Sequence, residues 1–374
     1  MITTELWVDM TNLRNTKVVQ TEAPELSEGD ILVAVEKFAI TANNVGYAVS
    51  GNIIGYWKYF PTDDQPWGKV TVWGMADVLE SRCEGIQAGE RLYGFFPMST
   101  HLKMTPSRVR DDNFIDGAAH RLELPALYNH YSRTKSEPIE LQAIEDARCI
   151  FFPLFITGYV IADFLMDNEW FGAEQIVVGS VSSKTGYGLA AFIKANGFQG
   201  NLIGMTSGRN KEFVESLELC DQITTYDEIE GLNQVPTAFI DMAGDGPIRA
   251  RLHHHLGDNM KTSQIVGITH WESEQINEKL PGSKPTFFFT PTQIEKRSKD
   301  WGPGVLEHKG YAASAGLVMK LKDQLKLEFH QGGEACAFIW ADMLDNKISG
   351  QQGIMVSLQE KDEENACTSF SKDD

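Results

Sequence analysis

The chain has 374 residues, 42% of them hydrophobic, and a formal net charge of −19. A chain of this length and composition can bury a sizeable core, and its length suggests two domains. The negative charge opposes nucleic acids and anionic membranes, so neither is expected as a general partner.

Cysteine usage and the absence of targeting signals favour a soluble cytoplasmic protein. Five cysteines are scattered without a C-x-x-C pair, which predicts free thiols and no structural zinc knot. The N-terminal "MITTELWVDMTNLRN" lacks the basic and apolar regions of a signal peptide. The longest apolar run, "CIFFPLFITGYVIADFLM", is interrupted by Pro153, Gly158 and Asp163 and is not expected to span a membrane.

The predicted elements change in character along the chain. Up to about Pro97, runs such as "GDILVAVEKFAIT" alternate apolar and polar positions, which predicts β-strands. From about Leu141, short apolar runs alternate with amphipathic stretches, which predicts a parallel sheet covered by helices on both faces. After about Leu306, "FIWADMLDNKISGQQGIMVSL" predicts a helix, a turn and a closing strand, and the charged tail 359–374 is expected to be disordered.

This order of elements predicts an α/β protein in which a doubly wound, Rossmann-type unit interrupts a β-rich domain. The β-rich domain is expected to comprise residues 1–140 together with 306–374. Residues 141–305 are expected to form the doubly wound parallel sheet and to bind a nucleotide.

A candidate phosphate site lies in "IVVGSVSSKTGYGLAAFIKANG", between a predicted strand and a predicted helix. An ATP-type loop requires G-x-x-x-x-G-K-[ST]. Here Gly179 stands one residue too close to Lys184, and Ser183 replaces the second glycine. Asp241 is the only candidate for the magnesium-binding aspartate of such a site. These departures disfavour an ATP site.

A dinucleotide site fits the same turn better. The first two glycines of a G-x-G-x-x-G fingerprint are replaced by Ser183 and Thr185, while later glycines still permit close helix–strand packing. The hydroxyls of Ser182, Ser183 and Thr185 and the ammonium of Lys184 could bind phosphate at the helix N-terminus. Taken alone, the turn is explained equally well as a plain strand–helix connection with an exposed lysine.

The end of the next predicted strand favours NADP(H) as the cofactor. "NLIGMTSGRN" supplies Thr206, Ser207, Arg209 and Asn210. An NAD site usually has an acidic residue here for the ribose 2′-hydroxyl, and an acid would repel a 2′-phosphate. Hydroxyls and an arginine suit that phosphate instead, although Arg209 could simply begin a solvated helix.

Taken in order, several segments resemble the medium-chain dehydrogenase/reductase superfamily, in its zinc-independent branch of quinone oxidoreductases and enoyl reductases. The segments are "PELSEGDILVAVEKFAITANNVGYAVSG", "GMADVLESRCEGIQAGERLYGFFP", "FFPLFITGYVIADFLMDNEWFGAEQIVVGS" and "FIDMAG". The Ser-Ser-Lys-Thr turn, "THWE" and "FFFTP" resemble an uncharacterised subgroup of it. The resemblance implies a GroES-like domain with a nested Rossmann domain, a homodimer, and cofactor contacts at Ala243 and Thr269.

The resemblance also implies reductase chemistry without a metal. Gly74, Met75 and Ala76 stand where zinc-dependent members carry G-H-E, and the four-cysteine zinc lobe is absent. The expected reaction is hydride transfer from NADPH to a small apolar carbonyl compound, namely a quinone, an enone or an enoyl thioester. Charge that develops on the carbonyl oxygen then requires a hydrogen-bond or proton donor.

Four side chains are candidates for the catalytic site. Tyr47 or Tyr56 is expected to be the donor, although either could instead pack in the core or at a pocket rim. Asn44 is expected to orient the substrate or the nicotinamide ribose, or else to be a turn residue. His270 follows the fifth strand of the parallel sheet, where ligands bind, and could act as an acid or base or lie on the surface.

Two other functions remain open at this stage. The altered glycine motif is compatible with a protein that binds NADP(H) and keeps the reductase fold without catalysing a reaction. The third hypothesis is a nucleotide phosphatase or kinase that uses Lys184.

Overall fold

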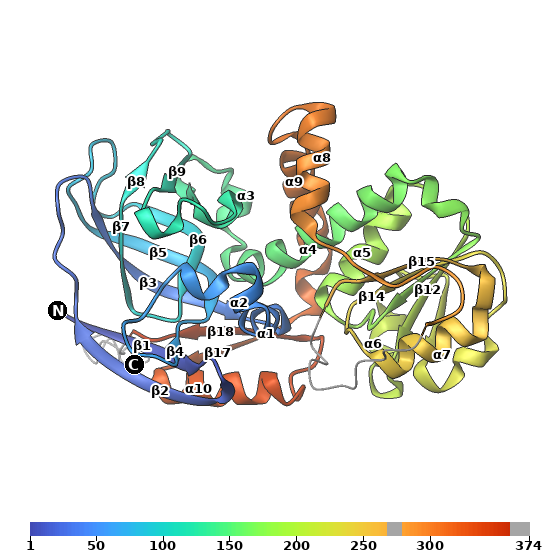
Figure 1. The fold of residues 1–374 in the computed structure, drawn as a ribbon. Coiled ribbons are helices and arrows are strands. Elements are labelled where there is room, and N and C mark those ends of the chain that lie inside the picture. The colour runs from blue at the N-terminus through green and yellow to red at the C-terminus, as the bar shows by residue number, and fades with distance from the viewer. Residues whose placement is uncertain (268–278, 360–374) are drawn as a thin grey trace, which may run out of the picture.

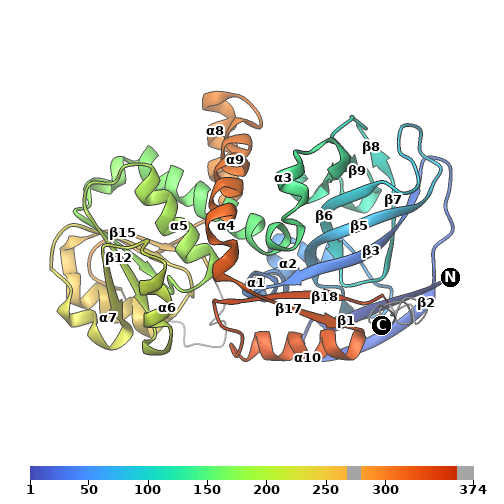
Figure 2. The ribbon, with the colours of Figure 1, turned by 180° about the vertical axis from the view of Figure 1, so that it is seen from behind.

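The computed structural model describes residues 1–267 and 279–359. The chain forms a β-rich part, on the left of Figure 1, and an α/β part, on the right. Between them stand two helices, α8 (Thr290–Trp301) and α9 (Val305–Leu321), and Figure 2 shows the same arrangement from behind. This division agrees with the fold class predicted from the sequence.

Two sheets build the β-rich part. Their strands are β1 (Ile2–Asp9), β2 (Asn12–Glu22), β3 (Ile31–Ile40), β4 (Trp67–Gly68), β5 (Thr71–Ser81), β6 (Arg91–Pro97), β7 (His101–Met104), β8 (Pro106–Ser107), β9 (Asn113–Asp116), β10 (His130–Arg133), β17 (Lys326–Gln331) and β18 (Gln352–Ser357). The smaller sheet has the order β2-β1-β4. The larger has the order β17-β18-β3-β5-β6-β10-β9-β8, with β7 beside β3.

The C-terminal segment returns to the β-rich part, as the sequence predicts. Helix α10 (Gly333–Leu344) buries Trp340 completely, and its indole Nε1 donates to the carbonyl of Leu13 at 2.8 Å. Strand β18 pairs antiparallel with β3 and parallel with β17. Strand β17 is an addition to the predicted elements, because its half-exposed edge position leaves no clear apolar pattern.

The α/β part contains a parallel sheet in the order β13-β12-β11-β14-β15-β16. Its strands are β11 (Gln175–Gly179), β12 (Asn201–Thr206), β13 (Gln222–Thr225), β14 (Thr237–Asp241), β15 (Met260–Ile265) and β16 (Thr286–Phe287). This is the strand order of a dinucleotide-binding fold, with the switch point between β11 and β14. Strand β11 is buried on both faces, because Ile176 and Val178 pack on one side and Val177 on the other.

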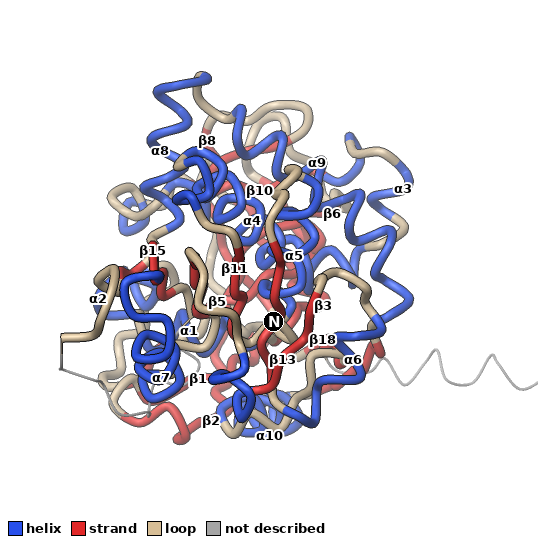
Figure 3. The backbone as a smooth tube through the Cα atoms, turned by 90° about the vertical axis from the view of Figure 1, so that its right-hand side faces the viewer, coloured by secondary structure: helices blue, strands red, loops and turns tan. Residues whose placement is uncertain are grey.

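Helices cover both faces of this sheet, so its strands read as continuous apolar runs. The helices are α4 (Glu145–Asp167), α5 (Lys184–Ala195), α6 (Lys211–Ser216) and α7 (Gly246–Leu256). Leu189 of α5 joins the core on one face, and Leu252 of α7 joins the core on the other. Figure 3 shows strands running through the interior of the molecule with helices around them.

Helix α4 is the one helix of the described ranges that is long and apolar enough to cross a membrane by length and composition, with a mean hydropathy of 2.0. However, 67% of that apolar window is buried inside the molecule. Its Gly158 lies against α5, where a Cβ would come within 2.9 Å of the Leu189 amide nitrogen. Helix α4 therefore serves here as a core helix between α5 and α9.

Three short helices complete the β-rich part where it faces the α/β part. They are the helices α1 (Ala42–Val49), α2 (Gly51–Ile54) and α3 (Ile139–Gln142). The predicted disordered tail lies outside the described residues, except for Gln359. Its Nε2 donates to the carbonyls of Val35 at 3.1 Å and Thr100 at 2.7 Å, so this residue belongs to the folded part. The domain boundaries stay predictions.

Candidate functional site

The turn after β11 carries the predicted phosphate-binding residues. Ser183 caps α5, and its Oγ accepts a hydrogen bond from the amide of Gly186 at 3.1 Å. A Cβ on Gly186 would lie 2.8 Å from the Ser180 carbonyl oxygen and from the Val181 Cα. Gly186 thus takes the role expected of a fingerprint glycine, since it lets the helix approach the strand closely.

Replacing Gly186 with alanine is expected to lower the free energy of unfolding by about 1–3 kcal/mol, because the backbone it would strike cannot move aside. Gly316, inside α9, is a matched control because a Cβ there meets nothing within 4 Å. Gly316→Ala is expected to stabilise the protein by about 0.5–1 kcal/mol through helix propensity. Urea unfolding of both variants measures the difference, and equal effects would contradict the close packing.

The end of β12 meets this turn through side-chain hydrogen bonds. The Ser182 Oγ accepts from the Thr206 hydroxyl at 3.1 Å and from the Asn210 Nδ2 at 3.2 Å. The Asn210 amide also donates to the Ser207 Oγ at 3.2 Å. The structure therefore brings these four predicted residues together, although Thr206 is fully buried behind the turn.

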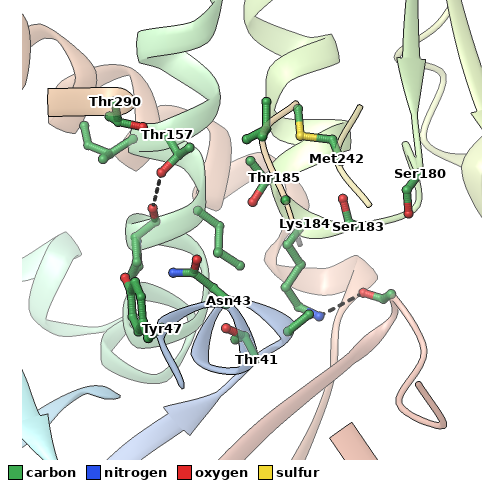
Figure 4. Close-up of a pocket in the computed structure, with 18 of the residues that line it drawn as sticks. Thr41, Asn43, Tyr47, Thr157, Ser180, Ser183, Lys184, Thr185, Met242 and Thr290 are labelled. Atoms are coloured by element: carbon green, nitrogen blue, oxygen red, sulfur yellow. Dashed lines mark hydrogen bonds between the residues drawn. The ribbon is translucent and has the colours of Figure 1, made fainter. Parts of the chain in front are cut away.

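Lys184 reaches away from the helix axis toward the C-terminal segment (Figure 4). Its ammonium donates to the carbonyl of Gly350 at 3.1 Å and to that of Gln352 at 2.7 Å. No carboxylate pairs with it among the described residues, and burial lowers the pKa of the Lys184 ammonium to about 8. A desolvated ammonium at a helix N-terminus is electrostatically unfavourable, and an anion would relieve this.

The C-terminal turn 345–351 contributes to the site, which sequence reasoning missed. Gly350 packs on the turn after β11 so tightly that a Cβ would lie 2.2 Å from the Ser182 carbonyl oxygen. The exposed Arg209 donates from Nη2 to the Asn346 carbonyl at 3.3 Å. Gly350, the first glycine in "ISGQQG", was the one available signal, and only the fold shows what it contacts.

A cavity of about 440 Å³ lies between the two parts of the chain. Among the predicted residues, those that line it are Tyr47, Tyr56, Ser182, Ser183, Lys184, Thr185, Ser207, Arg209 and Asn210. Turn residues such as Ser180 and Lys184 line one end, and the side chains of α1 and α4, including Tyr47 and Thr157, line the other (Figure 4).

Three tyrosines and a tryptophan form the second end. The Tyr47 and Tyr56 ring centroids are 4.4 Å apart, and the Tyr56 and Tyr128 hydroxyl oxygens are 2.9 Å apart. The Trp73 indole donates from Nε1 to the Tyr47 hydroxyl at 3.3 Å. Burial raises the pKa of Tyr47, Tyr56 and Tyr128, so all three hydroxyls keep their protons at neutral pH. Tyr128 was not predicted as a site residue.

Three predicted residues of the described ranges do not line the cavity: Thr206, which is buried behind the turn, Asn44 and Ala243. The Asn44 Oδ1 accepts from the Thr41 amide at 2.7 Å and its Nδ2 donates to the Thr71 carbonyl at 2.8 Å, so it caps α1. The neighbouring Asn43 faces the cavity instead. Ala243 is also buried, with its amide donating to the Asp241 Oδ1 at 3.1 Å, and Met242 lines the cavity in its place.

The remaining predictions concern the segment after β15. Thr269 and His270 lie outside the described residues. Phe287, Phe288 and Phe289 line the cavity, and Phe288 is also buried against Phe164, with ring centroids 5.2 Å apart. The described residues contain no group of three or more His, Cys, Asp or Glu side chains that could hold a metal ion.

The strand order, the turn whose Ser183 caps α5, and the cavity between the two parts define a two-domain α/β protein of the dinucleotide-binding type. The chain belongs to the family described as "Protein of unknown function (DUF2855)", whose family model matches residues 38–349. No curated protein matches the chain.

Solved structures share this fold at low sequence identity. CurA from Vibrio vulnificus, in complex with NADPH, has a TM-score of 0.60 and 12% identity, over 96% of this chain and 100% of that chain. A probable oxidoreductase from Mycobacterium abscessus has a TM-score of 0.54 and 12% identity, over 96% and 99% of the two chains. The quinone oxidoreductase from Coxiella burnetii has a TM-score of 0.51 and 14% identity, over 96% and 100%.

Proposed function

We propose that the chain is a zinc-independent, NADPH-dependent reductase that passes hydride to a quinone, an enone or an enoyl thioester. One observation carries this function. A single cavity joins a cationic end, with Lys184 and Arg209, to an end lined by tyrosine hydroxyls and aromatic rings. CurA, which has the same fold, was crystallised with NADPH, and other relatives in fold are named as oxidoreductases.

The residues at the cationic end fit a phosphorylated dinucleotide. The Lys184 ammonium has main-chain carbonyls as partners and no carboxylate among the described residues, so it can take a phosphate as counter-ion. Ser207 and Arg209 follow β12 at the position where the 2′-phosphate is discriminated from a hydroxyl. Bound here, NADPH would supply a hydride with its electron pair.

The aromatic end supplies what the acceptor needs from the protein. Tyr47 and Tyr56 each present a protonated hydroxyl, which can donate a hydrogen bond to an oxygen as negative charge develops on it. The buried rings around them exclude water, which strengthens such a hydrogen bond. Asn43 lies between the two ends of the cavity and replaces Asn44 as the candidate for orienting the ligands.

Preference for NADPH over NADH tests the cofactor assignment. Wild-type protein is expected to bind NADPH at least about tenfold more tightly, because one charge-assisted phosphate contact contributes about 1.4 kcal/mol or more. Arg209→Ala is expected to remove most of this preference and leave NADH binding unchanged. Arg82→Ala is the control, because this exposed arginine pairs with Glu80 and neither residue lines the cavity. Equal affinities of the wild type for NADPH and NADH would contradict the proposed 2′-phosphate site.

Turnover separates the reductase from a protein that only binds NADP(H). NADPH oxidation is expected with at least one member of a panel of quinones, enones and enoyl thioesters. Tight NADPH binding without oxidation across that panel would establish the binding protein instead. Titration with ATP tests the remaining hypothesis, and no ATP binding is expected.

In solution a homodimer of soluble chains is expected. Strand β16 is a two-residue edge strand of the parallel sheet, and its Phe287 is 52% exposed. An apolar strand edge of this kind can pair with a second copy. Sedimentation analysis measures the oligomeric state, and a monomer at micromolar concentration would contradict this expectation.

A further inference from the structure

Charge is distributed unevenly along the cavity. Among its described lining residues, Lys184 and Arg209 alone carry a charged side chain, and both contact the C-terminal turn 345–351 or its flank, Gln352. No Asp or Glu lines the described part of the cavity. The guanidinium of Arg148 lies behind the aromatic end, 3.8 Å from the Tyr93 ring centroid, and is held by Glu137. A charged group placed at the aromatic end would therefore lose its hydration without gaining a counter-ion.

The hydroxyl cluster at this end has more protons than its internal contacts use. The Tyr56 and Tyr128 hydroxyls share one hydrogen bond, with their oxygens 2.9 Å apart, so the two protons of this pair serve one contact between them. Because the Trp73 indole only donates, the Tyr47 hydroxyl accepts the hydrogen bond from Trp73 and keeps its own proton to donate. All three tyrosines line the cavity, where a spare hydroxyl proton of the cluster is satisfied best by an oxygen of a ligand.

The walls of this end are mostly flat rings. Trp73 and Tyr93 stack with centroids 5.6 Å apart and an interplanar angle of 25°, and both line the cavity. Phe152 of α4 and Tyr311 of α9 also line it, with ring centroids 6.1 Å apart. Rings of this kind pack well against a planar, apolar ligand, and they give little to a flexible charged carrier.

From the missing counter-ion, the spare donor and the flat walls, we infer that the acceptor is an uncharged, planar ring compound with a carbonyl oxygen, such as a simple quinone or a cyclic enone. Acyl thioesters of coenzyme A are excluded, because no cationic side chain among the described lining residues of this end would pair with their phosphates and the protein carries a net charge of −19. This inference rests on the proposed reductase function for its chemistry, and on the cavity alone for its ligand selectivity.

The reaction of a quinone balances with the groups present. Reduction adds two electrons and two protons to the ring. One proton and both electrons arrive as the hydride of NADPH, which leaves as NADP⁺. The second proton comes from a hydroxyl of the Tyr47–Tyr56–Tyr128 cluster onto the carbonyl oxygen, and solvent returns a proton to that hydroxyl.

Equilibrium binding tests the selectivity without requiring turnover. Isothermal titration of the full chain is carried out with 1,4-naphthoquinone, with its 2-sulfonate, and with crotonyl-coenzyme A, each with and without NADP⁺. The neutral quinone is expected to bind at least tenfold more tightly than the sulfonate, and crotonyl-coenzyme A is expected not to bind at the aromatic end when NADP⁺ is present. Equal binding of quinone and sulfonate, tighter binding of the thioester, or no quinone binding would each overturn the inference.

A matched pair of variants tests the hydroxyl cluster. Tyr128→Phe is expected to weaken naphthoquinone binding three- to tenfold and to leave naphthalene binding unchanged. Tyr59→Phe is the control, because it removes a buried hydroxyl that bonds the Pro125 carbonyl and does not line the cavity. Equal effects of the two variants on naphthoquinone would contradict the role of the cluster. If the binding order holds while NADPH is not oxidised, the reductase function fails and the ligand selectivity stands.

Discussion

Replacing Lys184 with methionine is expected to weaken NADPH binding by about ten- to hundredfold, because a hydrogen bond to a charged group contributes about 1.5–3 kcal/mol. The ammonium is largely desolvated and lacks a carboxylate partner among the described residues, so a phosphate is its best available counter-ion. Methionine keeps the volume of the side chain and removes only the charge and its hydrogen bonds. Fluorescence titration with NADPH measures the change.

Lys194→Met on the same helix is the control for this variant. Lys194 pairs with Asp221 at 3.1 Å and does not line the cavity, so its loss is expected to change NADPH affinity less than about twofold. If the two variants bind NADPH equally well, Lys184 only joins α5 to the C-terminal turn. That result would remove the lysine from the cofactor site.

The lowered pKa of Lys184 adds a pH dependence to the same measurement. Burial lowers the pKa of this ammonium to about 8, so it loses its proton within the stability range of the protein. Only the protonated form attracts phosphate. NADPH affinity is therefore expected to be flat from pH 7 to about 8 and to fall up to about tenfold for each further pH unit. Lys184→Arg is expected to bind NADPH with no such fall, since a guanidinium stays protonated.

Much of the fold could be predicted from the sequence, because local patterns report it directly. The run "EQIVVGS" predicts a strand buried on both faces, and β11 is that strand at the centre of the parallel sheet. The predicted helix after it begins at Lys184, and the structure adds that Ser183 caps it. The C-terminal helix and strand also lie where "FIWADMLDNKISGQQGIMVSL" predicts them.

The site was predicted less completely, because the site residues that were not predicted come from distant segments of the chain. Tyr128 lies in "LPALYNH", which carries no recognisable motif, and it meets Tyr56 only through the packing of two loops. The partners of Lys184 follow it by 166 and 168 residues. Asn44 was a site candidate because it stands in a motif-like loop, yet its neighbour Asn43 faces the cavity, since one residue along a helix turns the side chain by about 100°.

Strand β16 is shorter than the sequence pattern predicts, for a different reason. The apolar "PTFFFTP" predicts a strand, but the strand comprises only Thr286 and Phe287, and the Phe288 amide adds one hydrogen bond to the Ile265 carbonyl at 2.8 Å. The second proline of that run occupies the first turn of α8, where a proline is well tolerated, so the chain changes from strand to helix within a few residues. Local helix initiation therefore outweighs the strand propensity of the three phenylalanines.

The largest loss of stability is expected for Arg249→Met. The Arg249 guanidinium donates from Nη1 to the Asp241 Oδ2 at 2.8 Å, and both side chains are almost fully buried at the end of β14. Removing the cation leaves a buried carboxylate without its counter-ion, which costs about 3–5 kcal/mol. Chemical unfolding at neutral pH measures this loss, and a change below about 1 kcal/mol would contradict the pairing.

The stability loss of Arg249→Met is expected to depend on pH through the Asp241 carboxylate, and removal of that carboxylate is expected to restore part of the stability. Burial raises the pKa of Asp241, opposed by the amides of Gly244 and Ala243 and by Arg249, so removal of Arg249 raises it further. The folded variant then holds a proton that the unfolded chain releases above its ordinary carboxyl pKa, so the variant is stabilised as pH falls and its deficit shrinks toward pH 4. The double variant Asp241→Asn with Arg249→Met is expected to be more stable than Arg249→Met alone, because no unpaired charge remains buried.

Since Asp241 accepts from the Gly244 amide at 2.8 Å, it also holds the turn that carries Met242 to the cavity. NADPH affinity is therefore expected to recover with stability in the double variant, and recovery of stability alone would mean that the turn does not shape the site.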